Sequence, residues 1–497
     1  MTDGMPVTAR LARFGLAIAA AAALGLSGGA NLSAATYEVG PGKALSAVGD
    51  VPWEGLKAGD TVLIYWKPEG YHEKFNIGAA GTKDAPVTVR GVAGPNGELP
   101  VIDGRDATTR KGLTFNNEQR SILQIGPLKD SSVVPSNIVI ENLEFRSCRA
   151  PYEFTDSTGA KRKYQEDSGP IRFNACDGVI LRNSTIRDGG MGTLSSNSTR
   201  NITIEGCYYV DNGMETEKGA YVHQSYTETL GMIYQYNRFS HLRKDCTGTN
   251  LKDRSAGNVI RYNWIEGGNK EIDLPDWYDT MHTRMEIIAA GGKPDYEQWI
   301  KDDDAYRSTF IYGNVIIEPE NDGNPEMITY GGDMGEPQYY HKGILYFYNN
   351  TVVSKRADVT HVFKLKTRDE SCDARNNIFY TTAPGNTLAM MMYEGTLYMS
   401  HNWIKPGWTT SLAKEFNGDV IDDGTTATGE SPGFVDEAAQ DYHLATGSPC
   451  IDAGRDLPPR AVPDNNVSFE YVKHQKSEPR PSDGKIDIGA FEYAGQK

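Results

Sequence analysis

The sequence predicts an all-β protein folded as a right-handed parallel β-helix, which is a solenoid with loop insertions. Three observations predict this class. A short Asn-containing motif recurs along the 497 residues, its segments alternate apolar and polar residues, and long stretches of helical periodicity are scarce. Such short units cannot bury an apolar face alone, so they must stack on one another. Apolar and polar residues alternate in segments that are separated by turns of Gly, Asn and Asp, and this pattern favours strands over a helical repeat.

A secretory signal peptide is predicted at the N-terminus. Two arginines precede an apolar run, Phe14 to Leu26, and the small residues Ser33 to Ala35 follow it. This order is typical of an export signal. We therefore expect residues 1–35 to be cleaved and residues 36–497 to form a single domain, exported to the periplasm or the cell exterior. An uncleaved anchor is the alternative; no other apolar run approaches membrane length, so no other span is expected.

Composition limits the partners. The net charge is −16 and no basic tract is long enough to suggest nucleic acid, so we expect a monomer that binds none. The six cysteines lie far apart without a C-x-x-C pair, which argues against a zinc site. Export permits disulfides, but free buried thiols are equally compatible. The sequence does not choose among the pairings of Cys148, Cys176, Cys207, Cys246, Cys372 and Cys450.

Residues 36–104 are predicted to cap the solenoid and form its first coils. Ala44 to Leu56 is a short helix candidate. Strands are expected within Lys57 to Tyr65, Ala85 to Val92 and Pro100 to Gly104, which carry G-D-T-V, A-P-V-T-V-R-G and V-I-D-G. That order resembles the N-terminal region of secreted right-handed parallel β-helix proteins.

Nine copies of the motif follow, each anchored on a late Asn, or on Gly in the one copy that lacks it. N-V-I-R-Y-N-W-I, from Asn258 to Ile265, is one example. Asn suits the anchor because it tolerates left-handed turns and can hydrogen-bond to stacked copies of itself. We expect the nine anchors to align in one column. They are Asn142, Asn183, Gly206, Asn237, Asn263, Asn314, Asn350, Asn377 and Asn402.

Insertions interrupt the motif at residues 146–169, 211–219 and 276–307, and the last one is expected to contain a short helix. The motif fades after Trp403, and the ending carries S-P-G-F-V-D, G-S-P-C-I-D-A-G and D-I-G-A-F-E-Y. This ending resembles the C-terminal segment of secreted parallel β-helix proteins, so residues 431–497 are expected to close the domain.

Counting back from the anchors predicts which residues share a column on the outer face. Lys252 lies eleven residues before its anchor, and alternation along a strand turns Lys252 and Arg254 toward solvent. By pattern Glu271 and Asp273 also face outward. Glu271 should then lie beside Asn250, and Asp273 beside Lys252 at about 4.8 Å. The same offset from other anchors selects Arg172, Ser195, Tyr226, Lys366 and Met391.

The arithmetic predicts an exposed stripe that could bind a glycan. Its expected substrate-binding residues are Arg172, Tyr226, Asn250, Tyr330, Lys364, Lys366 and Arg368. The histidines show no metal-binding spacing such as H-E-x-x-H, so each is expected to be a surface or packed residue. They are His223, His241, His282, His341 and His361.

The segment L-K-D-R-S-A-G-N-V-I-R-Y-N, from Leu251 to Asn263, resembles the K-S and N-x-I-R-x-N segment of the alginate lyase and chondroitinase B family. These are polysaccharide lyases with a parallel β-helix of the pectin lyase-like type. The resemblance implies that Lys252 is the base that takes the proton alpha to the uronate carboxyl. The family's acid, an Arg about one coil later, has no counterpart, because Asp273 occupies its place. The family's Asn and acidic calcium ligands are not clearly matched.

The residues themselves suit such an elimination, which needs a base, a cation that neutralises the carboxylate, and a proton donor. Lys252, Arg254 and Asp273 are the expected catalytic set. Tyr226 or Tyr330 could donate a proton or stack on a sugar. We therefore expect an exported lyase that acts on an anionic, uronic-acid-containing polysaccharide.

Alternatives remain open. Glu271 and Asp273 alternate on one strand at about 7 Å, which fits a shared Ca²⁺ and equally the acid and base of an inverting glycoside hydrolase. A uronate C5-epimerase shares the proton abstraction. A glycan-binding surface protein would use the same stripe without catalysis. Lys252–Asp273 and Arg254–Glu271 could also be ordinary cross-strand ion pairs of a solvated charge ladder.

Overall fold

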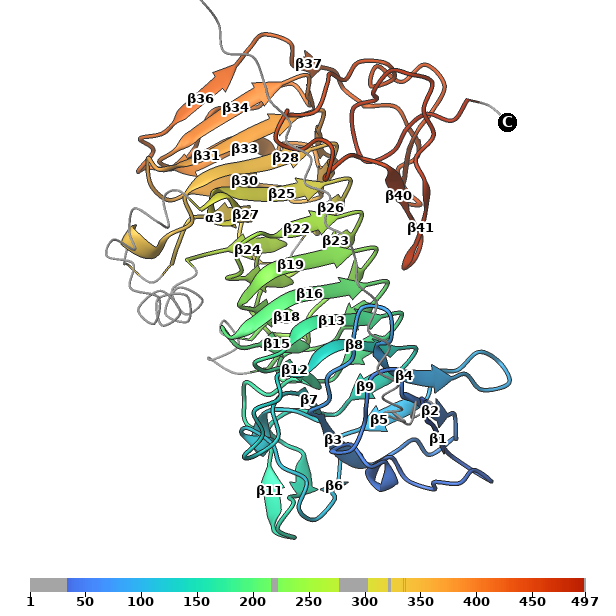
Figure 1. The fold of residues 1–497 in the computed structure, drawn as a ribbon. Coiled ribbons are helices and arrows are strands. Elements are labelled where there is room, and N and C mark those ends of the chain that lie inside the picture. The colour runs from blue at the N-terminus through green and yellow to red at the C-terminus, as the bar shows by residue number, and fades with distance from the viewer. Residues whose placement is uncertain are drawn as a thin grey trace, which may run out of the picture. The chain divides into compact units, whose positions relative to one another are not determined.

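Three long β-sheets form the body of the protein in the computed structural model (Figure 1). The structure describes residues 34–215, 222–276, 303–320, 323–333, 335 and 337–495. The described chain from Ala34 onward is one compact unit. Because the strands of each long sheet pair in parallel with few exceptions, the predicted parallel β-helix is confirmed. The expected signal peptide lies almost entirely outside the described residues, and its cleavage stays a prediction.

The first sheet, sheet 1, has 13 strands. In spatial order they are β1 (Thr36–Val39), β2 (Thr61–Tyr65), β4 (Val87–Val92), β8 (Ser136–Glu141), β13 (Asp177–Arg182), β16 (Thr199–Glu205), β19 (Thr229–Gln235), β22 (Val259–Arg261), β25 (Ser308–Tyr312), β28 (Gly343–Tyr348), β31 (Glu370–Arg375), β34 (Thr396–Ser400) and β36 (Asp419–Asp422).

The second sheet, sheet 2, also has 13 strands and carries the residues of the expected stripe. They are β11 (Lys161–Lys163), β10 (Glu153–Thr155), β6 (Ala107–Thr109), β3 (Glu73–Ile77), β7 (Leu123–Ile125), β12 (Ile171–Phe173), β15 (Thr193–Ser195), β18 (Ser225–Thr227), β21 (Leu251–Asp253), β24 (Ile272–Leu274), β27 (Glu326–Tyr330), β30 (Val359–Leu365) and β33 (Thr387–Tyr393). Only the β10–β11 hairpin in this sheet is antiparallel among the described strands.

The third sheet, sheet 3, has 11 strands. They are β5 (Val101–Asp103), β9 (Glu144–Arg146), β14 (Thr185–Arg187), β17 (Tyr208–Val210), β20 (Arg238–Phe239), β23 (Trp264–Glu266), β26 (Val315–Glu318), β29 (Thr351–Ser354), β32 (Ile378–Thr381), β35 (Trp403–Ile404) and β37 (Ala427–Thr428). From β19 to β33 each coil therefore adds one strand to sheet 1, then sheet 3, then sheet 2, and Figure 1 shows these coils stacked along one axis.

Helical structure is short throughout the described residues. The helix expected over Ala44 to Leu56 is wrong: the chain there makes a single 3₁₀ turn, η1 (Val48–Asp50). Other turns are η2 (Glu118–Arg120) and η4 (Pro337–Tyr339). The helix expected in the third insertion is represented by α3 (Asp304–Arg307), where Asp303 caps the first turn by accepting from the Tyr306 amide.

The core lies inside the coils, and strand alternation builds it. Leu251, Ile272, Ile328 and Phe363 pair along β21, β24, β27 and β30 and are at most 1% exposed. Their neighbours in the chain point to the opposite face of sheet 2. The apolar column thus sets which side chains face away from the core.

Six of the nine anchors form a continuous asparagine ladder. In each successive pair, the side-chain oxygen of the later Asn accepts the backbone N–H and the side-chain amide of the earlier Asn, at 2.9–3.1 Å. These buried amides satisfy turn groups that water cannot reach. The six are Asn237, Asn263, Asn314, Asn350, Asn377 and Asn402.

The other three anchors correct the one-column prediction. Strand register aligns Asn142, Asn183 and Gly206 with the residue that precedes each ladder Asn, for example Tyr236 and Tyr262. Every member of this neighbouring column has a φ of 49–65°. The two properties for which Asn was expected are therefore divided between adjacent columns: one holds the left-handed turn and the other makes the ladder.

The C-terminal segment folds back along the outside of the coils (Figure 1). It contains the hairpins β38 (Phe434–Asp436) with β39 (Asp441–Leu444), and β40 (Phe469–Val472) with β41 (Lys476–Pro479). Its apolar residues Tyr442, Tyr471 and Phe491 bury the outward side chains of sheet 3, among them Trp264 and Trp403. This segment therefore covers a flank of the solenoid.

All six cysteines are free thiols, and five are buried. Burial raises the pKa of Cys148 and Cys207 to about 12, so these thiols are unreactive packing residues. No helix in the described part of the chain is long and apolar enough to cross a membrane.

Candidate functional site

The outer face of sheet 2 brings the candidate residues into one column. Pairing aligns Tyr226 of β18 with Lys252 of β21, and Lys252 with Asp273 of β24, as expected. The offset also places Arg172 in this column correctly, and it is wrong by a residue or two for the other three positions. The column continues through Leu194 instead of Ser195, Lys364 instead of Lys366, and Met392 instead of Met391. The cause is loop length: Lys252 precedes its ladder Asn by 11 residues, and Lys364 precedes Asn377 by 13.

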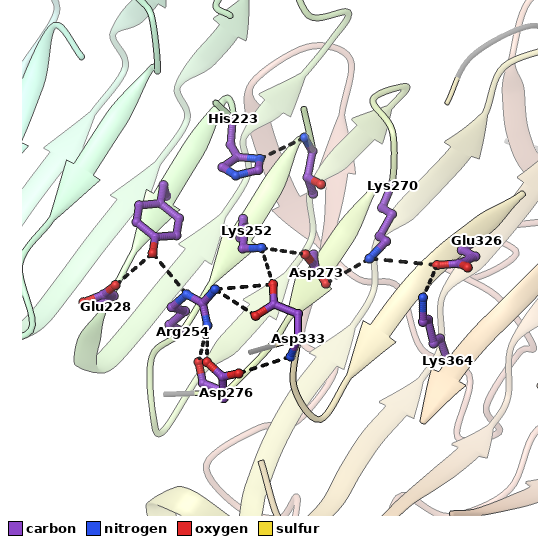
Figure 2. A network of polar contacts seen from close by, with 12 residues as sticks. His223, Glu228, Lys252, Arg254, Lys270, Asp273, Asp276, Glu326, Asp333 and Lys364 are labelled. Carbon is purple, nitrogen blue, oxygen red and sulfur yellow. Dashed lines mark hydrogen bonds and ion pairs between the residues drawn. The ribbon is translucent and has the colours of Figure 1, made fainter. Parts of the chain in front are cut away.

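Lys252 is the centre of this column. Its Nζ lies 2.6 Å from Asp333 Oδ2 and 3.2 Å from Asp273 Oδ2, and its side chain is 12% exposed (Figure 2). An ammonium between two carboxylates in partly dry surroundings is strongly paired. In this arrangement Lys252 is a cation and a proton donor.

Arg254 lies just beyond the end of β21 and points to the same carboxylate. Its NH2 group is 3.0 Å from Asp333 Oδ1, its NH1 group pairs with Asp276, and its Nε donates to the Tyr226 hydroxyl at 3.1 Å. Asp276 also accepts the backbone N–H of Asp333 at 3.1 Å. The guanidinium is thus locked in orientation, with one edge aimed at Asp333.

Asp333 therefore bridges Lys252 and Arg254 and was missed by sequence reasoning. Its side chain is 35% exposed, while Lys252, Arg254 and Asp273 are far more buried. The two cations keep the pKa of Asp333 lowered despite burial. The only sequence signal was its position three residues after β27, at the end of M-I-T-Y-G-G-D.

Tyr226 supplies a polarised hydroxyl beside the cations. It donates to Glu228 Oε1 at 3.0 Å and accepts from Arg254. Burial and the Glu228 charge raise the pKa of Tyr226, so it is protonated at neutral pH. The Arg254 guanidinium partly offsets this shift, because it favours the phenolate that would form if the phenol gave its proton to a nearby oxygen.

A chain of alternating charges continues from Asp273 along sheet 2. Lys270 Nζ lies 3.4 Å from Asp273 and 3.9 Å from Glu326, and Lys364 Nζ lies 2.7 Å from Glu326 (Figure 2). Lys270 and Glu326 were not predicted. The adjacent cations Lys252 and Lys270 hold the pKa of Asp273 well below its usual range, although burial opposes this.

The expected metal site does not fit this arrangement. Glu271 is fully buried and Asp273 is 3% exposed, so the expectation that both face solvent is wrong. Asp273 is already paired with two ammonium groups. No group of three or more His, Cys, Asp or Glu side chains suited to a metal occurs among the described residues. The full burial of Glu271 also disfavours a hydrolase pair, because a glycan on the outer face cannot reach that carboxyl group.

Two predicted substrate contacts are buried away from the outer face. Tyr330 is fully buried, pairs with Leu274 and Leu365 on the inner face, and donates to the Lys342 carbonyl at 3.2 Å. Asn250 is fully buried and donates to the Glu266 carbonyl at 3.0 Å. Both assignments to the exposed stripe are therefore wrong.

The two outlying arginines lie beyond the cluster. Arg172 shares the column two strands before Tyr226, but it is 9% exposed and donates to the Asn116 carbonyl at 2.5 Å. Arg368 is exposed and pairs with Asp419. Neither contacts the residues around Lys252.

His223 packs behind the cluster as a neutral ring. Its Nδ1 accepts the Thr249 amide N–H at 3.0 Å, which leaves the ring proton on Nε2. Burial and the charge of Lys252 lower the pKa of His223 to about 3. The expectation of a packed histidine is confirmed here, and this tautomer cannot accept a proton at Nε2.

Beneath the cluster the coil interior is polar. Asp253 is fully buried, and its Oδ1 accepts from Thr227 at 2.9 Å and from the Ser255 amide at 3.0 Å. Its Oδ2 accepts from Asn258 at 2.9 Å. Burial raises the pKa of Asp253 to about 6. These bonds fix the turn that follows β21, from which Arg254 projects.

No family model and no curated protein matches the sequence. Solved structures match its fold. A pectate lyase, Pel9A, is 12% identical over 92% of this chain and 96% of its own, with a TM-score of 0.46. An alginate lyase from Paenibacillus sp. str. FPU-7 is 13% identical over 70% and 94%, with a TM-score of 0.41. A GH136 lacto-N-biosidase from Eubacterium ramulus is 11% identical over 79% and 67%, with a TM-score of 0.39. Polysaccharide lyases are thus among the structural neighbours of this chain.

Proposed function

We propose that this protein is a polysaccharide lyase that cleaves a uronic-acid-containing glycan by β-elimination. The observation that carries the proposal is the bridging carboxylate of Asp333. Lys252 and Arg254 converge on it from two directions, and it is the most exposed member of the cluster. A uronate carboxylate has the same charge and the same two oxygens, so it can take the place of Asp333 between these cations.

Binding there would prepare the sugar for elimination. Cations on the carboxylate stabilise the negative charge that develops when the neighbouring C5–H proton leaves. The electron pair of that bond forms the C4–C5 double bond, the C4–O4 bond breaks, and the leaving oxygen takes up a proton. The products are an unsaturated uronide and a new chain end.

The residues can be assigned to these steps. Arg254 holds the carboxylate, and Tyr226 gives its proton to the leaving oxygen, because the adjacent guanidinium stabilises the resulting phenolate. Lys252 takes the C5 proton after it has released its own ammonium proton to solvent, once Asp333 has left its 2.6 Å contact, so Arg254 is then the cation that faces the substrate carboxylate. His223 is excluded as base by its tautomer. Asp273 positions Lys252.

Variants of Lys252 separate a base from a simple cation. Lys252→Ala should still fold, because Lys270 also pairs with Asp273, but it should lose at least about a hundredfold in turnover, the lower range for a general base. Lys252→Arg keeps the charge but cannot become neutral, so it should be as inactive as Lys252→Ala. The measurement is absorbance of unsaturated uronide during incubation with a panel of uronate polymers, with thermal unfolding as the folding control. Substantial activity of Lys252→Arg would reassign Lys252 to charge neutralisation.

The same incubations discriminate the other candidate activities. New reducing ends without absorbance would indicate a hydrolase, and an altered C5 configuration without cleavage would indicate an epimerase. Retained binding without any product would indicate a glycan-binding protein. Fold alone does not distinguish these activities.

The setting follows from the predicted export signal. We propose that the protein meets an anionic polysaccharide in the periplasm or outside the cell, and that it acts as a monomer. Size-exclusion chromatography of the secreted protein tests both parts of this proposal.

A further inference from the structure

The outer face of sheet 2 carries a second cationic group beyond the Lys252 cluster. Lys364 and Lys366, at and just past the end of β30, lie 5.1 and 4.5 Å from the ring centre of Tyr393 in the neighbouring strand β33. Lys364 is committed to Glu326. Lys366 makes no ion pair with any residue that the structure describes, and its side chain is partly exposed. A cation with no carboxylate partner, in an acidic protein, is available to an anionic ligand.

The neighbouring backbone restricts where the Lys366 side chain can lie. Its stem passes over Gly331, where an added Cβ would lie 2.8 Å from Lys366 Cβ. Gly331 also has a φ of 132°, which side chains rarely adopt, so this position accepts only Gly without strain. The backbone N–H of Lys366 is held by Glu370 at 2.8 Å. Gly331 belongs to the same short segment as Asp333, so Lys366 adjoins the proposed uronate site.

Tyr393 is held in a strained conformation. It ends β33 with a φ of 67°, a left-handed value that is strained for an aromatic residue. Among the described tyrosines with such a φ, Tyr236 and Tyr262 belong to the recurring turn column, whereas Tyr393 does not. Strain outside a repeated structural position is a pointer to function. Here it presents a partly exposed ring beside two ammonium groups.

Several cations lie near Lys366, and the carboxylates of Glu326 and Asp333 offset only part of their effect on its pKa. Burial and the neighbouring charges of Lys364 and Lys270 lower the pKa of Lys366, so these cations are close enough to repel one another. An anion placed among them relieves that repulsion. The row of Lys364 lies three strand spacings from that of Lys252, about 14 Å, so the group is too far away to bind the same sugar ring.

We propose that Lys366 and Tyr393 form a second subsite, which binds a further acidic sugar unit of the same polysaccharide on the side of the Lys252 cluster nearer the C-terminal coils. The proposal rests on the proposed function for the identity of the polymer. Lys366 binds the carboxylate of this unit, and the Tyr393 ring packs against its apolar face. The bound chain thus runs along the solenoid axis, across the strands of sheet 2.

Substrate length tests the subsite. The variants are Lys366→Met, which keeps most of the stem, and Tyr393→Asn, which removes the ring but tolerates the left-handed turn. Each should raise KM for sodium alginate or sodium polygalacturonate about tenfold, the effect of one charge-assisted contact, and leave kcat unchanged. With the shortest oligomer that is cleaved, both variants should match the wild type.

Lys355→Met is the matched control, because this substitution also removes one positive charge. Lys355 lies elsewhere, after β29 of sheet 3, where it pairs with Glu266. It should leave KM unchanged at every length. Equal KM for Lys366→Met and the wild type, or the same rise for short and long substrates, would overturn the subsite.

Binding separates the failure of this proposal from the failure of the proposed function. If the wild type forms no unsaturated product, calorimetric titration with the same two polymers still reports on the subsite. Tenfold weaker binding by Lys366→Met, with unchanged binding by Lys355→Met, supports it. Identical affinities of the two variants reject it.

Discussion

Asp333 competes for the two cations that a uronate carboxylate would need. It reaches Lys252 and Arg254 from a short segment after β27, and it is the exposed edge of an otherwise buried cluster. The remaining carboxylates, Asp273 and Asp276, lie deeper and hold the cations in place. At the scale of single residues, the cations are therefore already arranged around a carboxylate, as the proposed binding of a uronate requires.

Asp333→Asn should strengthen substrate binding. The amide keeps the shape but loses the charge that must be displaced, so KM for a uronate polymer should fall by about three- to fivefold, the range of a partly exposed ion pair. Steady-state kinetics at low salt measure this. Asp373→Asn, which removes a carboxylate paired with Arg375 on sheet 1, is the control and should have no effect. A rise in KM for Asp333→Asn would instead make Asp333 part of the substrate contact.

Individual contacts were only partly predictable from the sequence. Alternation placed Lys252 beside Asp273 because β21 and β24 are flanked by clear apolar residues. It failed at Tyr330, because M-I-T-Y has apolar residues at both parities. It failed at Glu271 because this residue precedes β24, where the pleat no longer sets direction. Asp333 and Asp276 follow their strands, and no pattern specifies where such side chains point.

At the scale of secondary-structure elements, the asparagine ladder connects each coil to the next by hydrogen bonds. Asn314 shows how many hydrogen bonds one ladder residue makes. Its Nδ2 donates to the carbonyls of Ile260 and Tyr312 and to the side chain of Asn350. Its Oδ1 accepts two hydrogen bonds from Asn263. All of these groups are buried, so each lost bond exposes an unsatisfied polar atom. The motif predicted the coils because this ladder demands Asn. It misplaced three anchors because a left-handed turn also selects Asn or Gly.

Asn314→Ala should lower the free energy of unfolding by about 2–4 kcal/mol, since several buried polar groups lose their partner together. Asn402→Ala should cost less, because this residue ends the ladder and its Nδ2 bonds only the Ala374 carbonyl. Chemical denaturation of both variants compares them. Equal losses would mean that the ladder bonds contribute independently of position.

For the whole molecule, the fold class and the coil repeat were predictable, whereas the outer cover was not. The ending was expected to close the domain, yet it packs along sheet 3 and covers Trp264 and Trp403. Sequence patterns identify faces that must be buried, but they do not specify which distant segment buries them. The sequence pattern also did not predict a buried lysine in the first coils, because distant segments bury it. Lys74 is fully buried, donates to the Glu118 carbonyl at 2.6 Å and lies 3.4 Å from the Phe154 ring centre.

Lys74 should make the stability of the molecule pH-dependent. Burial lowers its pKa to about 7, below the unfolded value of about 10.5. Between these values the unfolded chain binds more protons, so the free energy of unfolding contributed by Lys74 rises with pH from about 7 to about 10.5. Lys74→Met should remove this rise and stabilise the protein at pH 6 by a few kcal/mol, partly offset by the lost cation–π contact.

Urea denaturation at pH 6 and pH 9 measures this effect. The exposed Lys111 provides the control variant Lys111→Met, which should follow the wild type at both values. If Lys74→Met keeps the full pH dependence of the wild type, another group is responsible.

The C-terminal segment also determines the order in which parts of the molecule can finish folding. Gln475 bonds the Gly206 carbonyl, and the Asn466 carbonyl accepts the Tyr262 hydroxyl, so partners more than 200 residues apart must meet. A ribosome or a secretion channel delivers the chain from its N-terminus, so the tryptophans of the middle coils wait uncovered until the last residues emerge. The last step of folding therefore requires the C-terminal segment. A prematurely terminated product would leave those apolar surfaces exposed and able to self-associate.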